Sequence, residues 1–424
     1  MALLLKNATY IDWQTLEFKI TNIIVEEGID GKIKFIENAD QAKIKNIKQT
    51  IDCSGKFVTK SFAVGHHHVY SALAKGMPAP KKSPGNFYEI LQYIWWTIDK
   101  CLDKDMIKYS AYATAIACAK AGSTFAIDHH ASPNFIKGSL NTIATAFEEV
   151  GVSHLLCYEL TDRDGLNKAG QGLEESEDYI KNHQGLVGMH ASFTIGDDTL
   201  KKAVEIARKY NSGLHVHVAE DLYDQKFTQE KYGKSVVQRF LEAGILDMPK
   251  TILVHCLHLD ELEREFINKS DCWVVENMES NLNNNVGYFS GKGIGEKIML
   301  GTDGMHSDML QSAKAAFFVG QRHDIIDYPS AYQRFRNVHH YLKSNGYKGD
   351  GDNNLVILDY KTATEINQDN FLGHFVFGIN SNHVTDVISN GKLIMKDRMI
   401  LTVDEDAIHS EAKKQGKRLW GRIR

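Results

Sequence analysis

Histidines and carboxylates at the ends of apolar runs are the residues of this chain best suited to chemistry. In VGHHHVY, residues 64–70, three histidines follow an apolar run. Side chains alternate between the two faces of a strand, so His66 and His68 would point to the same side. His215 and His217 have the same spacing. Imidazoles grouped with a carboxylate are typical ligands of a divalent transition-metal ion.

Polar residues end almost every one of eight apolar runs in the middle of the chain. A single histidine is usually a hydrogen-bonded core or surface residue, but chance placement would not select so many run ends. In a (β/α)8 barrel the carboxyl ends of all strands converge on one mouth. We therefore predict that His66, His68, His217 and Asp303 bind one divalent metal ion, with zinc favoured and iron as the alternative. The runs are FAVGHHH (62–68), GSTFAIDHH (122–130), SHLLCYEL (153–160), GLVGMHASF (185–193), SGLHVHVAE (212–220), KTILVHCLH (250–258), DCWVVEN (271–277) and KIMLGTDG (297–304).

The segments between these runs predict the fold that brings the polar residues together. Residues 197–211, for example, carry apolar side chains at helical spacing from Leu200 to Ala207, with Asp197 or Asp198 as the expected N-cap. Continuous apolar runs that alternate with amphipathic helices are typical of a parallel sheet, and eight such units match an α/β fold of the (β/α)8 barrel type. The alternative, an open doubly wound sheet, would carry a glycine-rich phosphate loop after its first strand, and none is present.

Both ends of the chain have a different pattern from the middle. Residues 18–37 read as a hairpin around Gly28–Gly31, and Asn390-Gly391 is a strong hairpin turn signal near the other end. We predict a barrel over residues 59–352. Residues 1–58 and 353–424 would together form one small β domain.

The composition argues against several classes of protein. The 424 residues carry a net charge of −5, without the basic surface of a nucleic-acid-binding protein. The six scattered cysteines form no C-x-x-C pair, which is typical of reduced thiols in a cytoplasmic protein. The first residues lack a basic leader, and no stretch approaches 18 apolar residues. We expect neither a signal peptide nor contact with a membrane.

The motifs resemble, in order and spacing, those of the amidohydrolase superfamily. The similarity is greatest to its chlorohydrolase/aminohydrolase branch and, within that branch, to SsnA-type aminohydrolases. The resemblance implies a mononuclear metal-dependent hydrolase that deaminates a small heterocycle such as a purine, pyrimidine, pterin or triazine. It also implies that the β domain formed by both chain ends, residues 1–58 and 353–424, is a small β-sandwich domain, and that the protein is a homodimer. The motifs are HHHVYSALAKGM, DHHASP, CYELTDRDG, GMHASFT, HVHVAED, LVHCLHLD, SNLNNNVG and LGTDG.

The resemblance also implies roles for single residues. Glu220 falls on the acid/base of an H-x-x-E motif, and His255 on a strand-six histidine near the reacting water. Asp303 falls on an aspartate that both binds metal and accepts a proton. His190 matches a strand-four histidine near the substrate. The end of strand four, GMHASF, lacks the lysine that bridges two metal ions in binuclear relatives, which favours one ion.

Other positions leave alternatives open. Arg163, in LTDRDG, would anchor a substrate carbonyl or carboxylate, or be tied to a neighbouring aspartate in a turn. Two motifs depart from the family pattern: Lys60-Ser61 replaces Pro-Gly before strand one, and ENMESN at 276–281 replaces H-N-P-x-S-N. SNLNNN at 280–285 would form a substrate loop or only a turn.

Two other functions compete with deamination. The same site could hydrolyse a cyclic amide or a carbon–halogen bond. In a different class, the chain would be a non-catalytic metal-binding accessory protein, although its complete set of proton-handling residues argues against that alternative.

Overall fold

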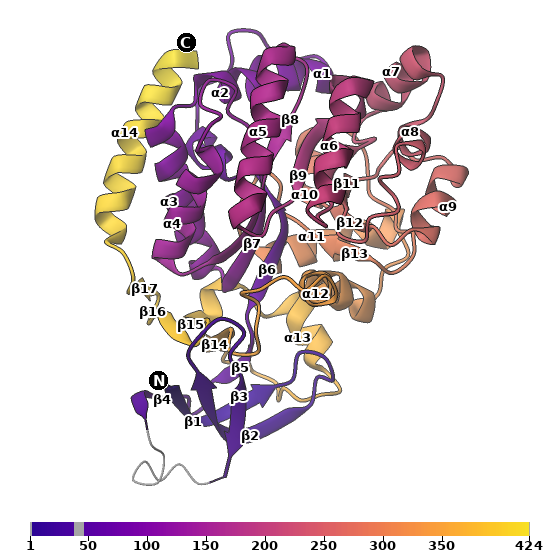
Figure 1. Cartoon of the computed structure of the whole chain (residues 1–424). Coiled ribbons are helices and arrows are strands. Elements are labelled where there is room, and N and C mark those ends of the chain that lie inside the picture. Colours follow the sequence, from indigo (N-terminus) through magenta and orange to yellow (C-terminus); the bar gives the residue numbers. More distant parts are fainter. Residues whose placement is uncertain (1, 38–45, 424) are drawn as a thin grey trace.

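Eight parallel strands form the centre of the molecule, in a computed structural model that describes residues 2–37 and 46–423 (Figure 1). Neighbours in sequence are neighbours in the sheet, from β6 to β13. Each strand falls within one of the eight predicted runs, so the predicted barrel strands are confirmed. The strands are β6 (Phe62–His67), β7 (Ser123–His130), β8 (Ser153–Leu160), β9 (Val187–Ala191), β10 (Leu214–Val218), β11 (Ile252–His255), β12 (Trp273–Glu276) and β13 (Ile298–Leu300).

The residues that follow β13 close the sheet into a nearly complete barrel. The main-chain N–H groups of Thr302 and Asp303 donate to the His66 carbonyl at 2.9 and 3.2 Å. The N–H of His68 donates to the Asp303 carbonyl at 3.3 Å. This seam between the first and last strands lies where the predicted metal ligands are.

Helices surround the barrel as the alternating pattern predicts. In α6 (Asp197–Lys209), residues such as Leu200, Val204 and Ala207 are buried against the sheet. The predicted N-cap is wrong, because Gly196 occupies that position and Asp197 and Asp198 lie in the first turn. The other barrel helices are α3 (Lys104–Lys120), α4 (Ser139–Val150), α5 (Leu166–Asn182), α7 (Leu222–Tyr232), α8 (Val236–Glu242), α9 (Glu261–Lys269), α10 (Met278–Asn283), α11 (Met309–His323) and α12 (Tyr328–Ser344).

Helix α12 covers the amino-terminal ends of the barrel strands. Its Val338, Tyr341 and Leu342 belong to the same buried cluster as side chains inside the barrel. Arg336 donates to the carbonyl oxygen of Ser61 at 2.9 Å, and Asn337 to that of Ile298 at 2.7 Å. The barrel is therefore filled at this end, and only the carboxyl ends of its strands are available for a site.

Both chain ends contribute to one mixed sheet below α12 (Figure 1). Strand β5 joins them, because it pairs with β1 from the N-terminal side and with β14 from the C-terminal side. The two predicted hairpins are present as β2–β3 and β15–β16. The strands are β1 (Ala2–Ile11), β2 (Phe18–Glu26), β3 (Ile33–Ile36), β4 (Ile47–Asp52), β5 (Phe57–Lys60), β14 (Leu355–Leu358), β15 (Val384–Ser389), β16 (Lys392–Lys396) and β17 (Met399–Ile400).

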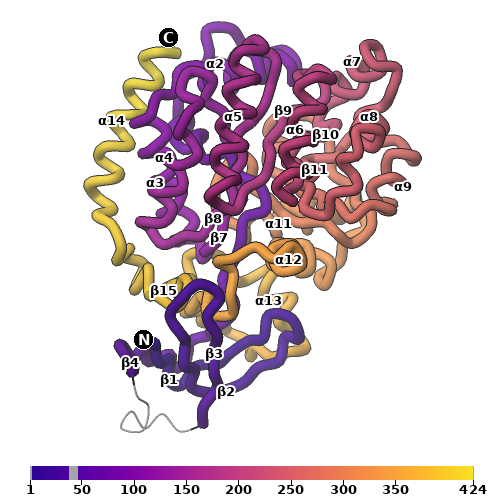
Figure 2. The backbone as a smooth tube through the Cα atoms, in the orientation of Figure 1, coloured from indigo at the N-terminus to yellow at the C-terminus, as the bar shows by residue number. Residues whose placement is uncertain are grey.

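The C-terminal helix α14 (Glu405–Ile423) leaves this sheet and lies along α3 of the barrel (Figure 2). The Trp420 indole N–H donates to the Leu73 carbonyl at 2.8 Å, and Arg422 pairs with Asp103 at 2.7 Å. The short helix α13 (Phe371–Phe377) packs against α12. The predicted domain limits at 58/59 and 352/353 stay predictions, since β5 crosses the first and α14 contacts the barrel.

Short helical segments close over the mouth of the barrel. They comprise α1 (Phe87–Ile90), the π-helical turn η3 (Leu91–Trp95) and α2 (Trp96–Cys101). A π-helical turn is rare and is frequent at functional sites. Elsewhere, 3-10 turns are η2 (Val69–Ala74), η4 (Ser192–Thr194) and η5 (Ser381–His383). Among the described residues, no helix has both the length and the apolar character needed to cross a bilayer.

Candidate active site

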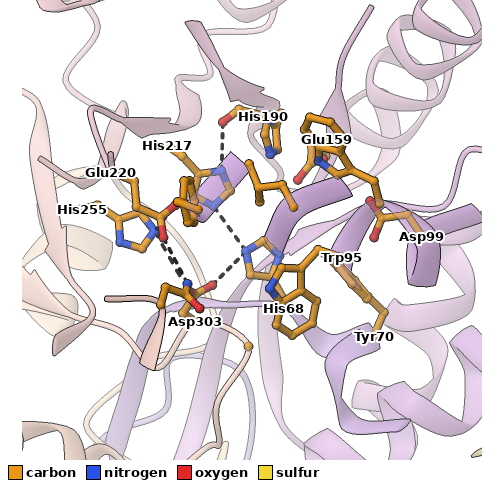
Figure 3. A pocket seen from close by; sticks show the side chains of 15 residues that line it. His68, Tyr70, Trp95, Asp99, Glu159, His190, His217, Glu220, His255 and Asp303 are labelled. Carbon is orange, nitrogen blue, oxygen red and sulfur yellow. Dashed lines mark hydrogen bonds and ion pairs between the residues drawn. The ribbon is translucent and has the colours of Figure 1, made fainter. Parts of the chain in front are cut away.

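The four predicted metal ligands meet at the mouth of the barrel. Figure 3 shows three of them, His68, His217 and Asp303. His68 Nε2 lies 3.0 Å from Asp303 Oδ1 and 3.3 Å from His217 Nε2. His66 Nε2 lies 3.4 Å from His217 Nε2 and 3.5 Å from Asp303 Oδ1. The structure therefore brings together donor atoms that are up to 237 residues apart in the sequence.

The other ring nitrogen of each histidine fixes which nitrogen faces this cluster. Nδ1 of His68 donates to the His129 carbonyl at 2.7 Å, and Nδ1 of His217 donates to the His190 carbonyl at 2.9 Å. A carbonyl oxygen can only accept, so both rings carry a proton on Nδ1 and turn Nε2 toward the ligand cluster. This arrangement is typical of metal-binding histidines, whose second nitrogen donates to a fixed acceptor.

Backbone geometry at the strand ends turns the side chains toward the barrel axis. Ala219, His255 and Asp303 have φ angles of 45°, 71° and 50°, in the left-handed region. Such conformations cost about 1–3 kcal/mol per residue and cluster at functional sites. Position 301 requires glycine for a steric reason, because a Cβ atom there would lie only 2.9 Å from the Cβ of His66.

The chemistry and spacing of the four donors fit a divalent metal ion. Three imidazole nitrogens and one carboxylate are ligands that zinc and iron accept. Four of the six distances between these donor atoms are 3.0–3.5 Å, and all four atoms lie within 4.8 Å of one another. Donors bound about 2.0–2.1 Å from one zinc ion are separated by about 3.3–3.4 Å in a tetrahedral site, so these distances leave room for a single ion.

Three groups suited to proton transfer lie beside the ligand cluster. His255 donates from Nδ1 to Asn281 Oδ1 at 2.8 Å, so its Nε2 is an acceptor. That atom is 3.5 Å from Glu220 Oε2 and 4.0 Å from Asp303 Oδ2. Two effects raise the pKa of Glu220 well above its usual value: burial, which is the larger, and repulsion from the Asp303 carboxylate. Burial lowers the pKa of His255, which favours the neutral imidazole.

Helix α10 and Asn284, the residue that follows it, supply a partner to each of these three groups. Besides the bond from His255 to Asn281, the Ser280 hydroxyl donates to Asp303 Oδ2, and Asn284 Nδ2 donates to Glu220 Oε1 at 3.4 Å. These residues belong to the SNLNNN motif, for which the sequence left a substrate loop or a turn open. Their part in holding the proton-transfer groups was not predicted, because it depends on the placement of α10 after β12.

A small cavity of about 50 Å³ lies between the ligand cluster and the segment 87–101. A volume of this size has room for only a few water molecules. A heterocyclic substrate therefore requires some of the lining side chains to move outward. The lining side chains are His68, Tyr70, Phe87, Leu91, Trp95, Trp96, Asp99, Glu159, His190, His217, Glu220, His255, Asn284 and Asp303.

His190, predicted to bind substrate, does line this cavity. Its Nδ1 is 2.9 Å from the Thr194 hydroxyl, which itself donates to the Ala191 carbonyl at 3.1 Å. Nδ1 of His190 therefore carries the proton and Nε2 is an acceptor. Burial lowers the pKa of His190 to about 3, so the ring is neutral near pH 7.

Arg163, also predicted to bind substrate, is not among the side chains that line the cavity. Its guanidinium pairs with Glu159 at 2.9 Å, with Asp99 and with Asp164, so its N–H groups point at carboxylates of the protein. Its role as a substrate anchor stays a prediction. Glu159 and Asp99, which it holds in place, line the cavity themselves. Asp99 comes from α2, and no strand-end pattern marks it in the sequence; burial raises its pKa to about 8.

The two departures from the family pattern have structural explanations. The Lys60 ammonium is buried against Asp350 at 2.9 Å and donates to the Gly351 carbonyl at 2.7 Å. Glu276 at the end of β12 pairs with Arg334 of α12 at 2.8 Å. Neither residue faces the ligand cluster, so both substitutions add buried ion pairs outside the site.

Known proteins resemble this chain in sequence and in fold. The sequence profile of the amidohydrolase family matches residues 64–331. The 5-methylthioadenosine/S-adenosylhomocysteine deaminase of Halothermothrix orenii is 25% identical over 452 residues, covering 99% of this chain and 100% of that protein. The 5′-deoxyadenosine deaminase of Methanocaldococcus jannaschii is 24% identical over 422 residues, covering 93% and 96%. The zinc-bound structure of an adenosine deaminase from Xanthomonas campestris has the same fold, with a TM-score of 0.83 at 16% identity over 98% of each chain.

Proposed function

Because the chain belongs to the amidohydrolase family, we propose that it is a metal-dependent aminohydrolase that removes an amino group, as ammonia, from a small nitrogen heterocycle. The observation that carries this proposal is the convergence of His66, His68, His217 and Asp303 beside Glu220 and His255. We propose the first four as ligands of one divalent ion and Glu220, His255 and Asp303 as the catalytic residues.

Asp303 has two oxygens with different surroundings, which suit two tasks. Its Oδ1 faces His66 and His68 in the ligand cluster, whereas its Oδ2 faces Ser280 and His255. When bound, a divalent ion acts as a Lewis acid and makes water nucleophilic near neutral pH. Asp303 Oδ2 would accept the proton of the attacking water, and His255 Nε2 would orient that water by accepting a hydrogen bond.

Glu220 is placed to move a proton between water and substrate. Its carboxyl is buried beside Asp303, which disfavours a second negative charge and keeps it protonated. The protonated carboxyl would donate to the ring nitrogen next to the carbon under attack. The resulting carboxylate would then take the second proton of the attacking water and pass it to the departing amino group, which leaves as ammonia, and the proton held by Asp303 would restore the Glu220 carboxyl. Such general acid–base catalysis typically contributes about 10²–10⁴-fold to the rate.

The far wall of the cavity indicates how the substrate is held. His190 Nε2 and the carboxylate of Glu159 offer acceptors, while Trp95 and Trp96 add flat apolar surface. We propose that His190 accepts a hydrogen bond from an N–H or O–H of the substrate. The relatives carry names of deaminases of adenosine derivatives, so aminopurine derivatives are the first class to test.

One experiment tests both the metal and the reaction. We expect purified protein to hold about one equivalent of a divalent metal, zinc in preference to iron, and to release ammonia from at least one member of a panel of aminopurines, aminopyrimidines, aminopterins and aminotriazines. Removing the metal with a chelator should abolish turnover, and adding it back should restore turnover. Two equivalents of metal would contradict the single-ion site.

The same panel separates the competing functions. Release of chloride from a chlorotriazine, or opening of a cyclic amide, without ammonia from any amine would favour those hydrolases. Metal-loaded protein that turns over no member of the panel would favour a non-catalytic metal-binding protein.

We propose two further properties, a cytoplasmic location and a homodimeric state. All six cysteines are free thiols, which is typical of a reducing compartment such as the cytoplasm. The homodimer rests on the family resemblance alone, and sedimentation equilibrium would test it.

A further inference from the structure

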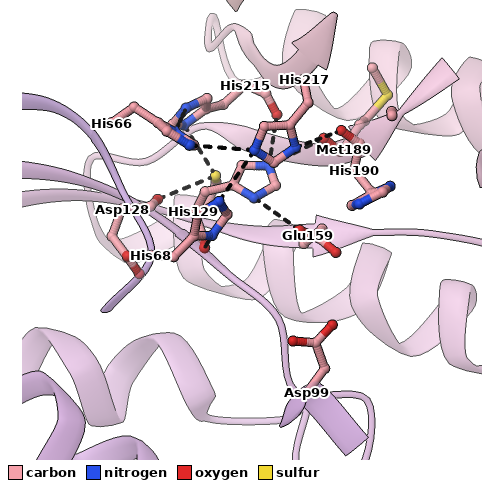
Figure 4. A network of polar contacts seen from close by, with 12 residues as sticks. His66, His68, Asp99, Asp128, His129, Glu159, Met189, His190, His215 and His217 are labelled. Carbon is pink, nitrogen blue, oxygen red and sulfur yellow. Dashed lines mark hydrogen bonds and ion pairs between the residues drawn. The ribbon is translucent and has the colours of Figure 1, made fainter. Parts of the chain in front are cut away.

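His66 differs from the other two proposed histidine ligands in what holds its ring. Nδ1 of His68 and Nδ1 of His217 each donate to a main-chain carbonyl, at 2.7 and 2.9 Å. Nδ1 of His66 instead lies 2.8 Å from Nε2 of His215, which is a side-chain nitrogen (Figure 4). His66 is therefore the one histidine ligand whose second nitrogen depends on another side chain.

The hydrogen bonds behind His66 run in a single direction. With its Nε2 facing the ligand cluster, His66 carries its proton on Nδ1 and donates it to Nε2 of His215. The proton of His215 is then on Nδ1, which is 3.5 Å from Cys157 Sγ. The Cys157 thiol in turn donates to the main-chain carbonyl of Asp128 at 3.4 Å. The last acceptor is a carbonyl oxygen, which cannot donate. The direction of all three hydrogen bonds is therefore fixed.

The hydrogen bonds between His66, His215 and Cys157 are buried, so water cannot replace a lost partner. His66, His215 and Cys157 each have 0% of their surface exposed. Within the described parts of the chain, the two ring nitrogens of His215 have no other hydrogen-bond partner than His66 and Cys157. Burial raises the pKa of the Cys157 thiol well above its usual value, so the thiol stays a donor. Loss of one partner would leave a buried polar group unpaired.

An imidazole nitrogen is a more basic acceptor than an amide carbonyl, so it draws more strongly on the proton of His66. Stronger hydrogen bonding at Nδ1 raises the basicity of the ligating Nε2 and fixes the orientation of the ring. We propose that His215 and Cys157 are positioning residues that hold His66 in its ligating tautomer and thereby set the affinity of the site for its divalent ion.

This His66–His215–Cys157 relay rests on the metal-binding role proposed above for His66. It goes beyond that role, because neither His215 nor Cys157 touches the ion or the substrate. Losing an outer partner of a metal ligand typically weakens metal binding by about 10–100-fold. The effect should therefore be visible in metal affinity without any substrate.

The central experiment compares His215→Leu with His215→Gln. Leucine removes the acceptor for His66, whereas the glutamine side-chain oxygen can accept near the position of Nε2. We expect chelator competition to show about 10–100-fold weaker zinc binding for His215→Leu and a near wild-type value for His215→Gln. The visible spectrum of the cobalt(II) form should shift only in His215→Leu, because it reports the ligand field of the ion.

His130→Leu is the matched control. His130 is also fully buried at a strand end, but its Nε2 bonds to the Ser132 hydroxyl at 2.9 Å and not to a proposed ligand. Its zinc affinity should be that of the wild type. An equal loss in His130→Leu, or unchanged affinity and spectrum in His215→Leu, would overturn the relay.

Cys157 gives an independent test if His215→Leu does not fold. Cys157→Ser keeps a group that can accept from His215 and donate to Asp128, whereas Cys157→Ala keeps neither. We expect weaker zinc binding in the alanine variant than in the serine variant, and equal affinities would overturn the proposal. If the wild type binds no divalent metal, the ligand set itself is wrong, which distinguishes failure of the site from failure of the relay.

Discussion

Glu220 is the residue whose substitution should separate metal binding from proton transfer. Its Oε2 is 3.5 Å from His255 Nε2, but Glu220 is not one of the four donors of the ligand cluster. We expect Glu220→Gln to keep the metal content of the wild type and to lose about 10²–10⁴-fold in kcat, because glutamine cannot transfer the proton. Metal analysis and steady-state ammonia release would measure the two effects.

Glu279→Gln serves as the control for that substitution. Glu279 lies on α10 close to the site, but its carboxylate bonds to His306 and Gln311 and does not line the cavity. Its kcat should stay within a few-fold of the wild type. Near wild-type turnover in Glu220→Gln would remove Glu220 from the mechanism.

At the scale of elements, α10 is the helix that fixes the proton-transfer groups. Asn281 accepts from His255 Nδ1 at 2.8 Å, which leaves His255 Nε2 as the acceptor that faces Glu220 and Asp303. We expect Asn281→Ala to lower kcat by about 10-fold or more with unchanged metal content, because the imidazole is no longer held in one tautomer. Asn281→Asp keeps an acceptor and should recover most of the rate.

Asn283→Ala tests whether any change in α10 has this effect. Asn283 is exposed on the same helix, and its side-chain amide donates to Asn284 Oδ1 at 3.1 Å. Its kcat should match the wild type. A comparable loss of turnover in both alanine variants would mean that α10 acts through its overall stability and not through the His255–Asn281 bond.

A second element-scale feature is the buried ion-pair cluster that joins β5 to α12. Asp350 is 2.9 Å from Lys60 Nζ and 2.8 Å from His339 Nδ1. Although burial opposes the charge, His339 and Lys60 lower the pKa of Asp350 from 3.8 to about 2. Its contribution to folding is therefore complete above pH 3.8 and is lost as the pH falls through about 2. It corresponds to about 2 kcal/mol at neutral pH.

We therefore expect Asp350→Asn to lower the free energy of unfolding by about 2 kcal/mol or more at pH 7. The difference from the wild type should shrink as the pH is lowered below 4. Asp352→Asn is the control, because its pair with Lys32 is exposed and contributes at most about 1 kcal/mol. Urea unfolding at several pH values would measure both, and a pH-independent difference for Asp350→Asn would contradict the assigned pKa.

The strands could be predicted from the sequence, but the short helices over the mouth of the barrel could not. The strands and the proposed ligands His66, His68 and Asp303 could be predicted from apolar runs and from a spacing of two residues, which are local features of the sequence. Asp99, Asn281 and the segment 87–101 come from short helices whose position over the mouth is set by tertiary packing. No local periodicity encodes that position, so the proton-transfer partners and the cavity wall emerged only from the structure.

For the whole molecule, the proposed ion lies at the seam where the barrel closes. His66 belongs to β6 and Asp303 follows β13, and the main chains of these two segments hydrogen-bond to each other at 2.9–3.3 Å. An ion held by both residues would cross-link the first and last barrel strands. Since the ligands converge only in the folded chain, metal binding should stabilise the whole fold.

We expect the Tm of metal-free protein to be lower than that of the metal-loaded form and to rise with the logarithm of free zinc. At a free metal concentration about 100 times Kd, the added stability is about 2.7 kcal/mol. Asp303→Asn should lose most of this increment. Asp350→Asn, at the opposite end of the barrel, should start from a lower Tm and keep the full increment, because distant sites contribute independently. Calorimetric scans over a zinc series would measure all three proteins. If the Asp303→Asn variant gained as much from zinc as the wild type does, the metal would have to bind somewhere other than the seam.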